Sequence, residues 1–319
     1  MLKRRTLVGA MCAGGIAALS WRPSAEAAAK KKKSASSAKK SSKKSAKPKG
    51  PDAAGPQDSD PTWQQLFDGA TLAGWQPLFA AKPLPKGAAP AAPTPNTVFT
   101  VVEDEGQKLL RVSGETFGAL VSTTSFSNYH LRLQWRWGNA KWPPRAHLRR
   151  SSGLIVHSLP GNVAFDAGKP WRPGLECELQ EGSCGDLCVG AGVRVEVPAR
   201  RERFMGSPLM MYTAGYPMLT VPAPDAEPRV VKSNDYEKGF GEWNVTDVFV
   251  MGADAAFLTN GKLCMQWGNA RTFTGDSEMP LTEGAIQLAS EGAELHVRKI
   301  ALRALDKMPD RFRLPKKQA

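Results

Sequence analysis

Short apolar or alternating runs, separated by turn residues, fill the sequence between Trp63 and Leu302. Such runs are typical of β-strands, and none of this region has the convincing periodicity of an amphipathic helix. We expect strands over Val98–Val102, Lys108–Val112, Ala119–Thr123, His130–Trp137, Gly153–His157, Leu175–Gln180, Gly192–Val197, Trp243–Met251, Ala255–Thr259, Lys262–Trp267, Ala285–Ala289 and Glu294–Leu302. Strands at this spacing predict an all-β sandwich of two antiparallel sheets.

Local patterns refine this prediction. The run HLRLQWRW at 130–137 alternates apolar and polar residues, as a strand with one buried face does. The dipeptide Asn260-Gly261, between two predicted strands, indicates a tight hairpin. Residues 198–235 have little periodicity and predict a long insertion loop at the rim of a cleft.

The first 27 residues have the pattern of an export signal. Three basic residues at positions 3–5 precede a short apolar run, and AEA at 25–27 fits a cleavage site between small residues. The string RRTLV resembles a twin-arginine signal, and ordinary secretion is the alternative. The apolar run is too short to span a bilayer. We therefore expect an exported protein, periplasmic or extracellular, with no transmembrane segment in the mature chain.

The net charge lies entirely at the N-terminus. The formal net charge is +13, and residues 1–50 hold fourteen Lys and Arg but one acid, Glu26, which accounts for all of it. The rest of the chain is neutral, so we expect no nucleic-acid partner. Residues 28–62, rich in Lys, Ser, Ala and Pro, predict a disordered linker. Its lysines could attract anionic cell-envelope polymers, or it could be a solvated spacer. After this linker we expect one β-sandwich domain over residues 63–305 and a basic C-terminal tail over residues 306–319.

The segment GLECELQEGSCGD, residues 174–186, carries the most suggestive chemistry. Strand alternation places Glu176, Glu178 and Gln180 on one face and apolar residues on the other. Same-face neighbours on a strand lie about 6.5–7 Å apart, a separation at which paired carboxylates do acid–base chemistry on a sugar. The alternative is a solvated strand face with no function.

Four cysteines remain after removal of the signal, and an exported protein meets an oxidising environment in which disulfides form. Cys184 and Cys188 are close together in a predicted loop, so we expect them to pair. Cys177 and Cys264 lie in predicted strands and either pair or stay as buried thiols. No histidine lies near the cysteines and no Gly-rich phosphate loop follows a strand, so we expect neither a metal nor a cofactor.

Seven segments occur along the chain in a characteristic order: LFDGATLAGW at 66–75, FSNYHLRLQWRWG at 126–138, RRSSGLIVH at 149–157, GLECELQEGSCGD at 174–186, GEWN at 241–244, NGK at 260–262 and EGAIQLASEGAELHVRKIALRAL at 283–305. Together they resemble the 3-keto-disaccharide hydrolase domain family of bacterial secreted proteins. The resemblance covers about residues 63–305 and implies a concanavalin-like jelly-roll β-sandwich with long loops. The chain departs from the family at Ser151, where an acid or Asn is usual, and at Glu178, where Gln is frequent.

The resemblance implies a carbohydrate partner and cleavage of glycosides that carry a ketone at C3. The ketone acidifies the proton on C2, so a base can abstract it and expel the leaving group, after which water adds to the enone. The candidate bases are Glu176, Glu178 and His157. The candidate substrate-binding residues are Arg150 for the enolate, Trp137 for stacking on a sugar, Gln180 and Asp186. Structural roles are the alternatives for His157, Arg150, Trp137 and Asp186, and Glu291 is interpreted as a turn or structural residue.

Two other functions stay open from the sequence. Glu176, Glu178 and Glu181 have the spacing of the acidic strand of laminarinase-like retaining glycosidases, in which the first acid is the nucleophile and the last is the acid–base. The other hypothesis is a non-catalytic carbohydrate-binding or envelope-anchoring module, because sandwiches of this type serve as lectins as well as enzymes.

Overall fold

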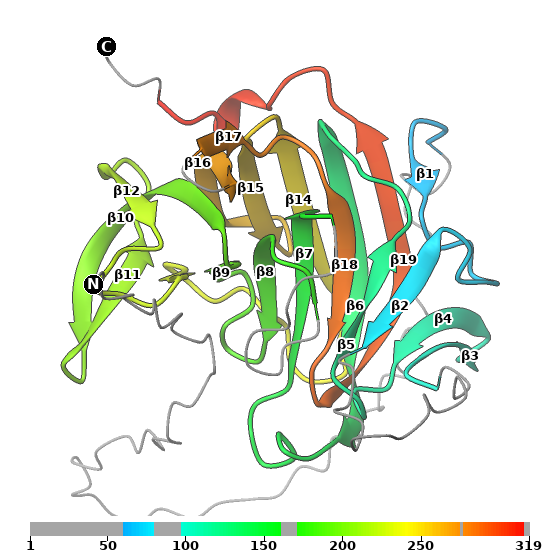
Figure 1. The fold of residues 1–319 in the computed structure, drawn as a ribbon. Helices are drawn as coiled ribbons and strands as arrows, with labels where there is room; N and C mark the ends of the chain where they lie inside the picture. Colours follow the sequence, from blue (N-terminus) through cyan, green and yellow to red (C-terminus); the bar gives the residue numbers. More distant parts are fainter. Residues whose placement is uncertain (1–59, 80–96, 161–170, 275–276, 316–319) are drawn as a thin grey trace, which may run out of the picture. The chain divides into compact units, whose positions relative to one another are not determined.

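The apolar runs of the sequence fold into strands (Figure 1). The structure is a computed structural model, and it describes residues 60–79, 97–160, 171–274 and 277–315. The strands are β1 (Gln64–Gln65), β2 (Trp75–Phe79), β3 (Phe99–Asp104), β4 (Gln107–Val112), β5 (Gly118–Ser122), β6 (Tyr129–Lys141), β7 (Ser151–Ser158), β8 (Leu175–Gln180), β9 (Leu187–Val189), β10 (Val193–Phe204), β11 (Ser207–Tyr212), β12 (Met218–Val221), β13 (Arg229–Val231), β14 (Asn244–Met251), β15 (Asp254–Thr259), β16 (Lys262–Thr274), β17 (Ser277–Pro280), β18 (Ala285–Ser290) and β19 (Ala293–Ala304). The short 3-10 helix η2 (Asp310–Phe312) follows β19.

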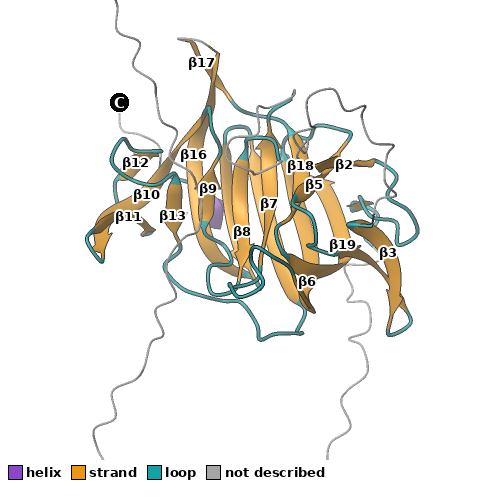
Figure 2. Cartoon of the chain, turned by 60° about the horizontal axis from the view of Figure 1, so that its bottom comes forward, coloured by secondary structure: helices purple, strands orange, loops and turns teal. Residues whose placement is uncertain are grey.

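One layer of the sandwich, here called the front sheet, has the strand order β2-β5-β18-β7-β8-β9-β13-β11-β10 (Figures 1 and 2). Its pairings are antiparallel except for the parallel contact between β11 and β13. Strands β7 and β8, which carry the candidate residues, therefore lie in the interior of this sheet, where neighbours on both sides fix their position.

The other layer, the back sheet, has the order β3-β4-β19-β6-β14-β15-β16. Strand β19 pairs with β4 near its start and with β1 near its end, both on the side that faces away from β6. Strand β10 pairs with β16, which joins the two layers at one side, and β12 and β17 extend this junction. The antiparallel two-sheet sandwich predicted from the sequence is confirmed.

The core lies between the two sheets and is made of the inward residues of each alternating strand. From β6 it receives Leu131, Leu133 and Trp135, all with no solvent exposure. From the front sheet, β7 and β8 contribute Leu154, Val156, Leu175, Cys177 and Leu179 to the same cluster. The period of two residues in these strands thus leaves their other side chains pointing away from the core, on the outer faces of the sheets.

The expected loop over residues 198–235 is not a loop. The second half of β10 forms a hairpin with β11, and β12 and β13 follow within the same segment. The hairpin turns at Met205 and Gly206, both with positive φ (48° and 85°), which is the backbone of a tight two-residue turn. The sequence does not show these strands because many Pro, Met and Arg residues hide their apolar alternation.

The ends of the chain differ in how much can be described. The predicted signal, residues 1–27, lies outside the described residues, and so does nearly all of the predicted linker over 28–62. Within the predicted tail, Met308 and Phe312 are buried against Phe249 of β14 in a small cluster on the outer side of the back sheet. No described helix is long and apolar enough to cross a membrane.

Candidate functional site

Strand β8 has the two faces that its sequence predicts. Leu175, Cys177 and Leu179 enter the core, whereas Glu176 and Glu178 lie on the outer face of the front sheet. Both glutamates are nevertheless buried, with 6% and 5% of their surface exposed. The alternative of a solvated strand face is therefore wrong for these two carboxylates, because neighbouring side chains cover them.

Glu176 owes its position to a glycine on the neighbouring strand. A Cβ atom built on Gly153 of β7 would lie 1.9 Å from Glu176 Oε1. Any side chain at position 153 would therefore displace this carboxylate, and glycine lets it fold across the strand. The opposite neighbour of Glu176 is Cys188 of β9.

Glu178 lies beside a hydroxyl that links it to a third carboxylate. Ser151 Oγ donates to Glu291 Oε2 at 2.7 Å and lies 3.4 Å from Glu178 Oε1. Gln180 Nε2 in turn donates to Ser151 Oγ at 3.3 Å. A hydroxyl has one proton to donate, so Ser151 gives it either to Glu291 or to Glu178, while a lone pair of the hydroxyl accepts from Gln180. Ser151, Glu178 and Glu291 are all buried.

A thiol and a guanidinium bound the other side of the carboxylates. Cys188 Sγ lies 3.6 Å from Glu178 Oε2, and the neighbour of Cys188 across the next strand pair is Arg229 of β13. Burial alone would lower the pKa of Arg229, but the carboxylates of Asp186 and Glu178 outweigh it and raise that pKa. Arg229 is therefore a permanent cation facing the glutamate cluster.

Asp186, a candidate for substrate binding, holds this cation in place. Its Oδ2 accepts from Arg229 Nη2 at 2.6 Å and from Nε at 3.1 Å, and its Oδ1 accepts from the backbone N–H of Lys232 at 3.0 Å. Asp186 is 1% exposed. Both oxygens of the Asp186 carboxylate accept hydrogen bonds from protein groups. In this structure Asp186 therefore orients the Arg229 guanidinium.

His157, a candidate base, does not lie beside the glutamates. Its Nε2 bonds to the backbone carbonyl of Gly252, in the turn between β14 and β15 of the back sheet, at 3.0 Å. The residue has a positive φ of 51°, at an irregularity in the pairing of β7 with β18. This kink breaks the alternation that the sequence prediction relied on. Burial lowers the pKa of His157 to about 4.

Arg150 and Glu181 neutralise each other. Arg150 Nη1 donates to Glu181 Oε1 at 2.8 Å, and the Arg150 backbone N–H donates to Oε2 at 2.9 Å. The guanidinium also lies over the ring of Phe240, 4.3 Å from its centroid. Neither residue is part of the cluster around Glu176 and Glu178. The laminarinase-like interpretation requires Glu181 as its acid–base, and here Glu181 is bound to Arg150 instead.

Trp137 is part of the core. It is 3% exposed, packs edge-on against Trp135, and its Nε1 donates to Glu237 Oε1 at 2.8 Å. The structure thus places Trp137 in the core, where its ring faces protein rather than solvent.

All four described cysteines are free thiols, so the predicted Cys184–Cys188 disulfide is absent from the structure. The reason is geometric: Cys188 faces Glu178, whereas Cys184 lies in the core with its Sγ 3.6 Å from Thr259 Oγ1. Burial raises the pKa of the Cys184 thiol, and that of Cys177 beside it.

Within the described residues, one group of donor atoms could surround a metal ion. Oxygen atoms of Glu176 and Glu178 and the sulfur of Cys188 lie within 4.8 Å of one another. Two carboxylates and a thiolate form a mixed hard and soft donor set, and the cation of Arg229 already faces it.

Three members of the cluster were missed as functional candidates. Ser151 was noticed only as a departure from the family, Cys188 only as a disulfide partner, and Glu291 only as a turn residue. Arg229 carried no signal at all, because it lies in the segment interpreted as a loop. Pairing of β8 with β7 and β9, and of β9 with β13, brings them together, and no local pattern shows those pairings.

The fold and the cluster together define a class: a β-sandwich with a buried carboxylate group on the outer face of one sheet. Over residues 62–303 the chain matches the family described as the 3-keto-alpha-glucoside-1,2-lyase-like domain. The chain belongs to this family, which makes it a carbohydrate-active protein with a jelly-roll fold.

Solved structures with a similar chain course include a putative glycosyl hydrolase from Parabacteroides distasonis ATCC 8503, with 16% identity over 76% of this chain and 94% of that chain and a TM-score of 0.43. The carbohydrate binding module CBM66 from Bacillus subtilis has 11% identity over 65% and 92%, with a TM-score of 0.34. The exoplasmic/lumenal domain of VIP36, bound to Ca²⁺ and Man2, has 11% identity over 69% and 86%, with a TM-score of 0.36. The comparison with curated proteins gives no match.

Proposed function

We propose that this protein cleaves 3-keto-glycosides by elimination between C1 and C2, followed by addition of water. The observation that carries the proposal is the pair of buried carboxylates, Glu176 and Glu178, whose oxygens lie within 4.8 Å of each other on the outer face of the front sheet. The family to which the chain belongs supports the type of substrate.

The reaction needs little more than this pair and a cation. A carboxylate takes the proton from C2, the C–H electrons form the C1–C2 double bond, and the C1–O bond breaks toward the leaving group. The leaving oxygen takes a proton from a carboxylic acid, and water then adds across the double bond. Two carboxyl groups this close cannot both ionise without repulsion, so one protonated and one ionised group is the favoured state.

We assign the base to Glu178 and the acid to Glu176. Glu178 has Ser151 and Cys188 around its two oxygens, which hold its orientation, and it acts electrostatically on Arg229. Glu176 is the other carboxyl of the pair and lies across Gly153 beside Glu178, so it takes the role of the acid that protonates the departing oxygen. Arg229, rather than the expected Arg150, is the cation positioned to stabilise the enolate.

The deciding experiment compares 3-keto disaccharides with the same disaccharides unoxidised, using the native protein, Glu176→Gln and Glu178→Gln. We expect turnover of the keto sugars only, reduced by about 10²–10⁴ in Glu178→Gln. Circular dichroism and thermal unfolding check that each variant folds. Glu181→Gln is the matched control, because Glu181 lies on the same segment but is bound by Arg150, and its activity should be unchanged.

One observation favours a second candidate, a non-catalytic carbohydrate-binding module. Glu176 and Glu178 are only 6% and 5% exposed, as expected for a structural cluster that no substrate reaches. Sugar binding without turnover, unchanged in both variants, would establish this alternative. Cleavage of unoxidised glucans would instead revive the laminarinase-like hypothesis.

Export to the periplasm or the cell exterior is part of the proposal and rests on the signal pattern of residues 1–27. An envelope polymer as a partner rests only on the charge of residues 28–62. Deleting this linker should lower adhesion to anionic polymers at low salt, because exposed charges are screened by ions.

A further inference from the structure

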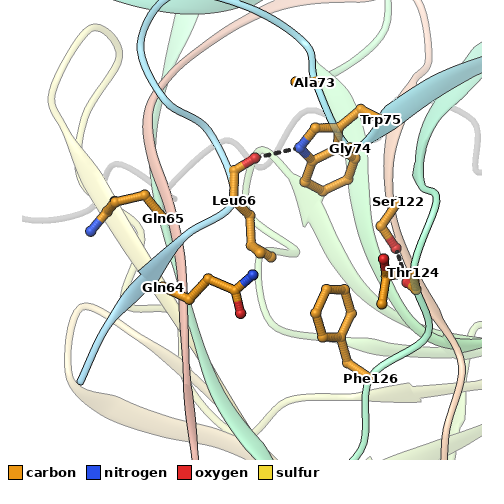
Figure 3. A pocket seen from close by; sticks show the side chains of 9 residues that line it. All are labelled: Gln64, Gln65, Leu66, Ala73, Gly74, Trp75, Ser122, Thr124 and Phe126. Carbon is orange, nitrogen blue, oxygen red and sulfur yellow. Dashed lines mark hydrogen bonds between the residues drawn. The ribbon is translucent and has the colours of Figure 1, made fainter. Parts of the chain in front are cut away.

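A cavity of about 130 Å³ lies at an edge of the sandwich, away from the glutamate cluster (Figure 3). It forms where the chain crosses from the back sheet, which β1 joins, to the front sheet, which β2 joins. Its lining residues are Gln64, Gln65, Leu66, Ala73, Gly74, Trp75, Ser122, Thr124 and Phe126. Strands β18 and β7 separate its front-sheet wall, β5, from β8.

The walls of this cavity are fixed by internal hydrogen bonds. Trp75 Nε1 donates to the carbonyl of Leu66 at 2.6 Å. Ser122 Oγ donates to the carbonyl of Thr124 at 2.8 Å and accepts from the backbone N–H of Ile286 at 2.9 Å. The polar atoms of Trp75 and Ser122 are therefore occupied, and these residues shape the cavity rather than offer bonds to a ligand.

Two other polar side chains at the cavity are available. Figure 3 shows the carboxamide of Gln64 directed across the opening toward Phe126, while Gln65 turns away, and Thr124 borders the far side. Within the described part of the chain, neither the Gln64 carboxamide nor the Thr124 hydroxyl forms a hydrogen bond with the protein. A carboxamide and a hydroxyl both donate and accept, which matches the hydroxyl groups of a sugar.

The lining also excludes charged ligands. None of its nine residues is ionisable, so an anion or a cation would lose its hydration without a compensating partner. Phe126 and Leu66 supply apolar surface for the carbon skeleton of a ligand, and a mixture of apolar walls and a few polar groups is typical of small-molecule sites. An apolar cavity of about 150 Å³ holds one benzene ring, so a cavity of about 130 Å³ that is open on one side suits a single ring rather than a longer chain.

We propose that this cavity is a second carbohydrate site, which holds one neutral pyranose ring of a glycan. The ring would pack on Phe126 and Leu66 and exchange hydrogen bonds with Gln64 and Thr124. The site is separate from Glu176 and Glu178, so it does not depend on the proposed reaction. Its role would be to hold the protein on a glycan while the glutamate cluster is free for its own ligand.

The test is titration calorimetry on the full chain with three neutral probes: methyl α-glucoside, methyl α-mannoside and methyl β-galactoside. Glucose 6-phosphate serves as the charged comparison. At least one neutral probe should bind at millimolar concentration and more tightly than the phosphorylated sugar. Gln64→Leu and Thr124→Val, which keep the size of each side chain, should each weaken binding by about three- to tenfold, since each removes one net hydrogen bond.

Two control variants separate this site from the rest of the molecule. Gln76→Leu makes the same change on an exposed residue of β2 outside the lining, and Glu178→Gln changes the cluster. Both should bind the probe as the native protein does. The proposal is overturned if no neutral probe binds, if Gln64→Leu and Thr124→Val bind normally, or if Glu178→Gln abolishes binding. Thermal unfolding of all variants ensures that a loss reflects the site rather than the fold.

Discussion

Ser151 and Glu291 are 140 positions apart in the sequence, yet the hydroxyl of one donates to the carboxylate of the other at 2.7 Å. This bond connects the start of β7 with the turn between β18 and β19, next to Glu178. Ser151 is also the position at which the chain departs from the family pattern, and we infer that it orients Glu178. Where an acid or Asn is usual, this chain has a hydroxyl that bridges two carboxylates.

We therefore expect Ser151→Ala to lower kcat on a 3-keto substrate by about ten- to a hundredfold, because Glu178 loses a neighbour that fixes its orientation. The same change should cost about 1–3 kcal/mol of unfolding free energy by leaving the buried Glu291 oxygen without this donor. The matched control is Ser152→Ala, whose hydroxyl donates to the carbonyl of Ala289 at 2.8 Å on the core side of the strand. It should lose stability but keep its activity. Equal activity of the two variants would contradict a positioning role for Ser151.

Gly153→Ala tests the position of Glu176 without changing an ionisable group. The new Cβ would overlap Glu176 Oε1, only 1.9 Å away, and the carboxylate must rotate aside. We expect about a hundredfold loss of turnover with a modest loss of stability, of about 1–3 kcal/mol. Steady-state kinetics and denaturant unfolding measure the two effects. A fully active Gly153→Ala protein would show that Glu176 does not act from the position seen here.

The sequence was sufficient for properties that depend on alternation within one strand. Apolar periodicity located the strands of the sandwich core and placed Glu176 and Glu178 on one face of β8, because the pleat dictates that placement. It failed for His157, where a positive φ breaks the alternation, and for Cys184, which a turn carries into the core.

The rest of the site required long-range pairing. Arg229 and Glu291 reach the cluster from segments that are distant in sequence, and Cys188 reaches it through the pairing of β9 with β8. Alternation within a single strand predicts none of these contacts. Trp137 is the opposite case, a residue proposed for the site that does not lie in it. An aromatic residue typical of sugar sites is a core residue here, because its neighbours along β6 alternate inward and place it there.

The thiols give a prediction that connects structure with export. If the chain is exported through the signal at residues 1–27, the mature protein meets oxidants, yet Cys184 and Cys188 face different sides of the front sheet. We expect mass spectrometry of the mature, non-reduced protein to show a chain lacking the signal and no peptide linking Cys184 to Cys188. An intact Met1 would contradict the export proposal, and a Cys184–Cys188 link would contradict the structure of this turn.

His157 predicts how stability depends on pH. Burial lowers its pKa to about 4 in the folded protein, whereas the value in an unfolded chain is about 6.5. The unfolded state therefore binds more protons between these values, so the contribution of His157 to stability is complete above pH 6.5 and is lost as the pH falls toward 4. This difference in pKa corresponds to about 3 kcal/mol of unfolding free energy.

His157→Asn isolates this effect, because Asn accepts the positive φ of 51° at this position and does not titrate. We expect the unfolding free energy of the native protein to fall more steeply than that of His157→Asn between pH 6.5 and 4, and the two curves to run parallel above pH 7. Carboxylates such as Asp247 titrate in both proteins and cancel in the difference. The control is His147→Asn at an exposed position, which should leave the native pH profile unchanged. Parallel curves for native protein and His157→Asn throughout this range would show that His157 is not the neutral, buried imidazole described here.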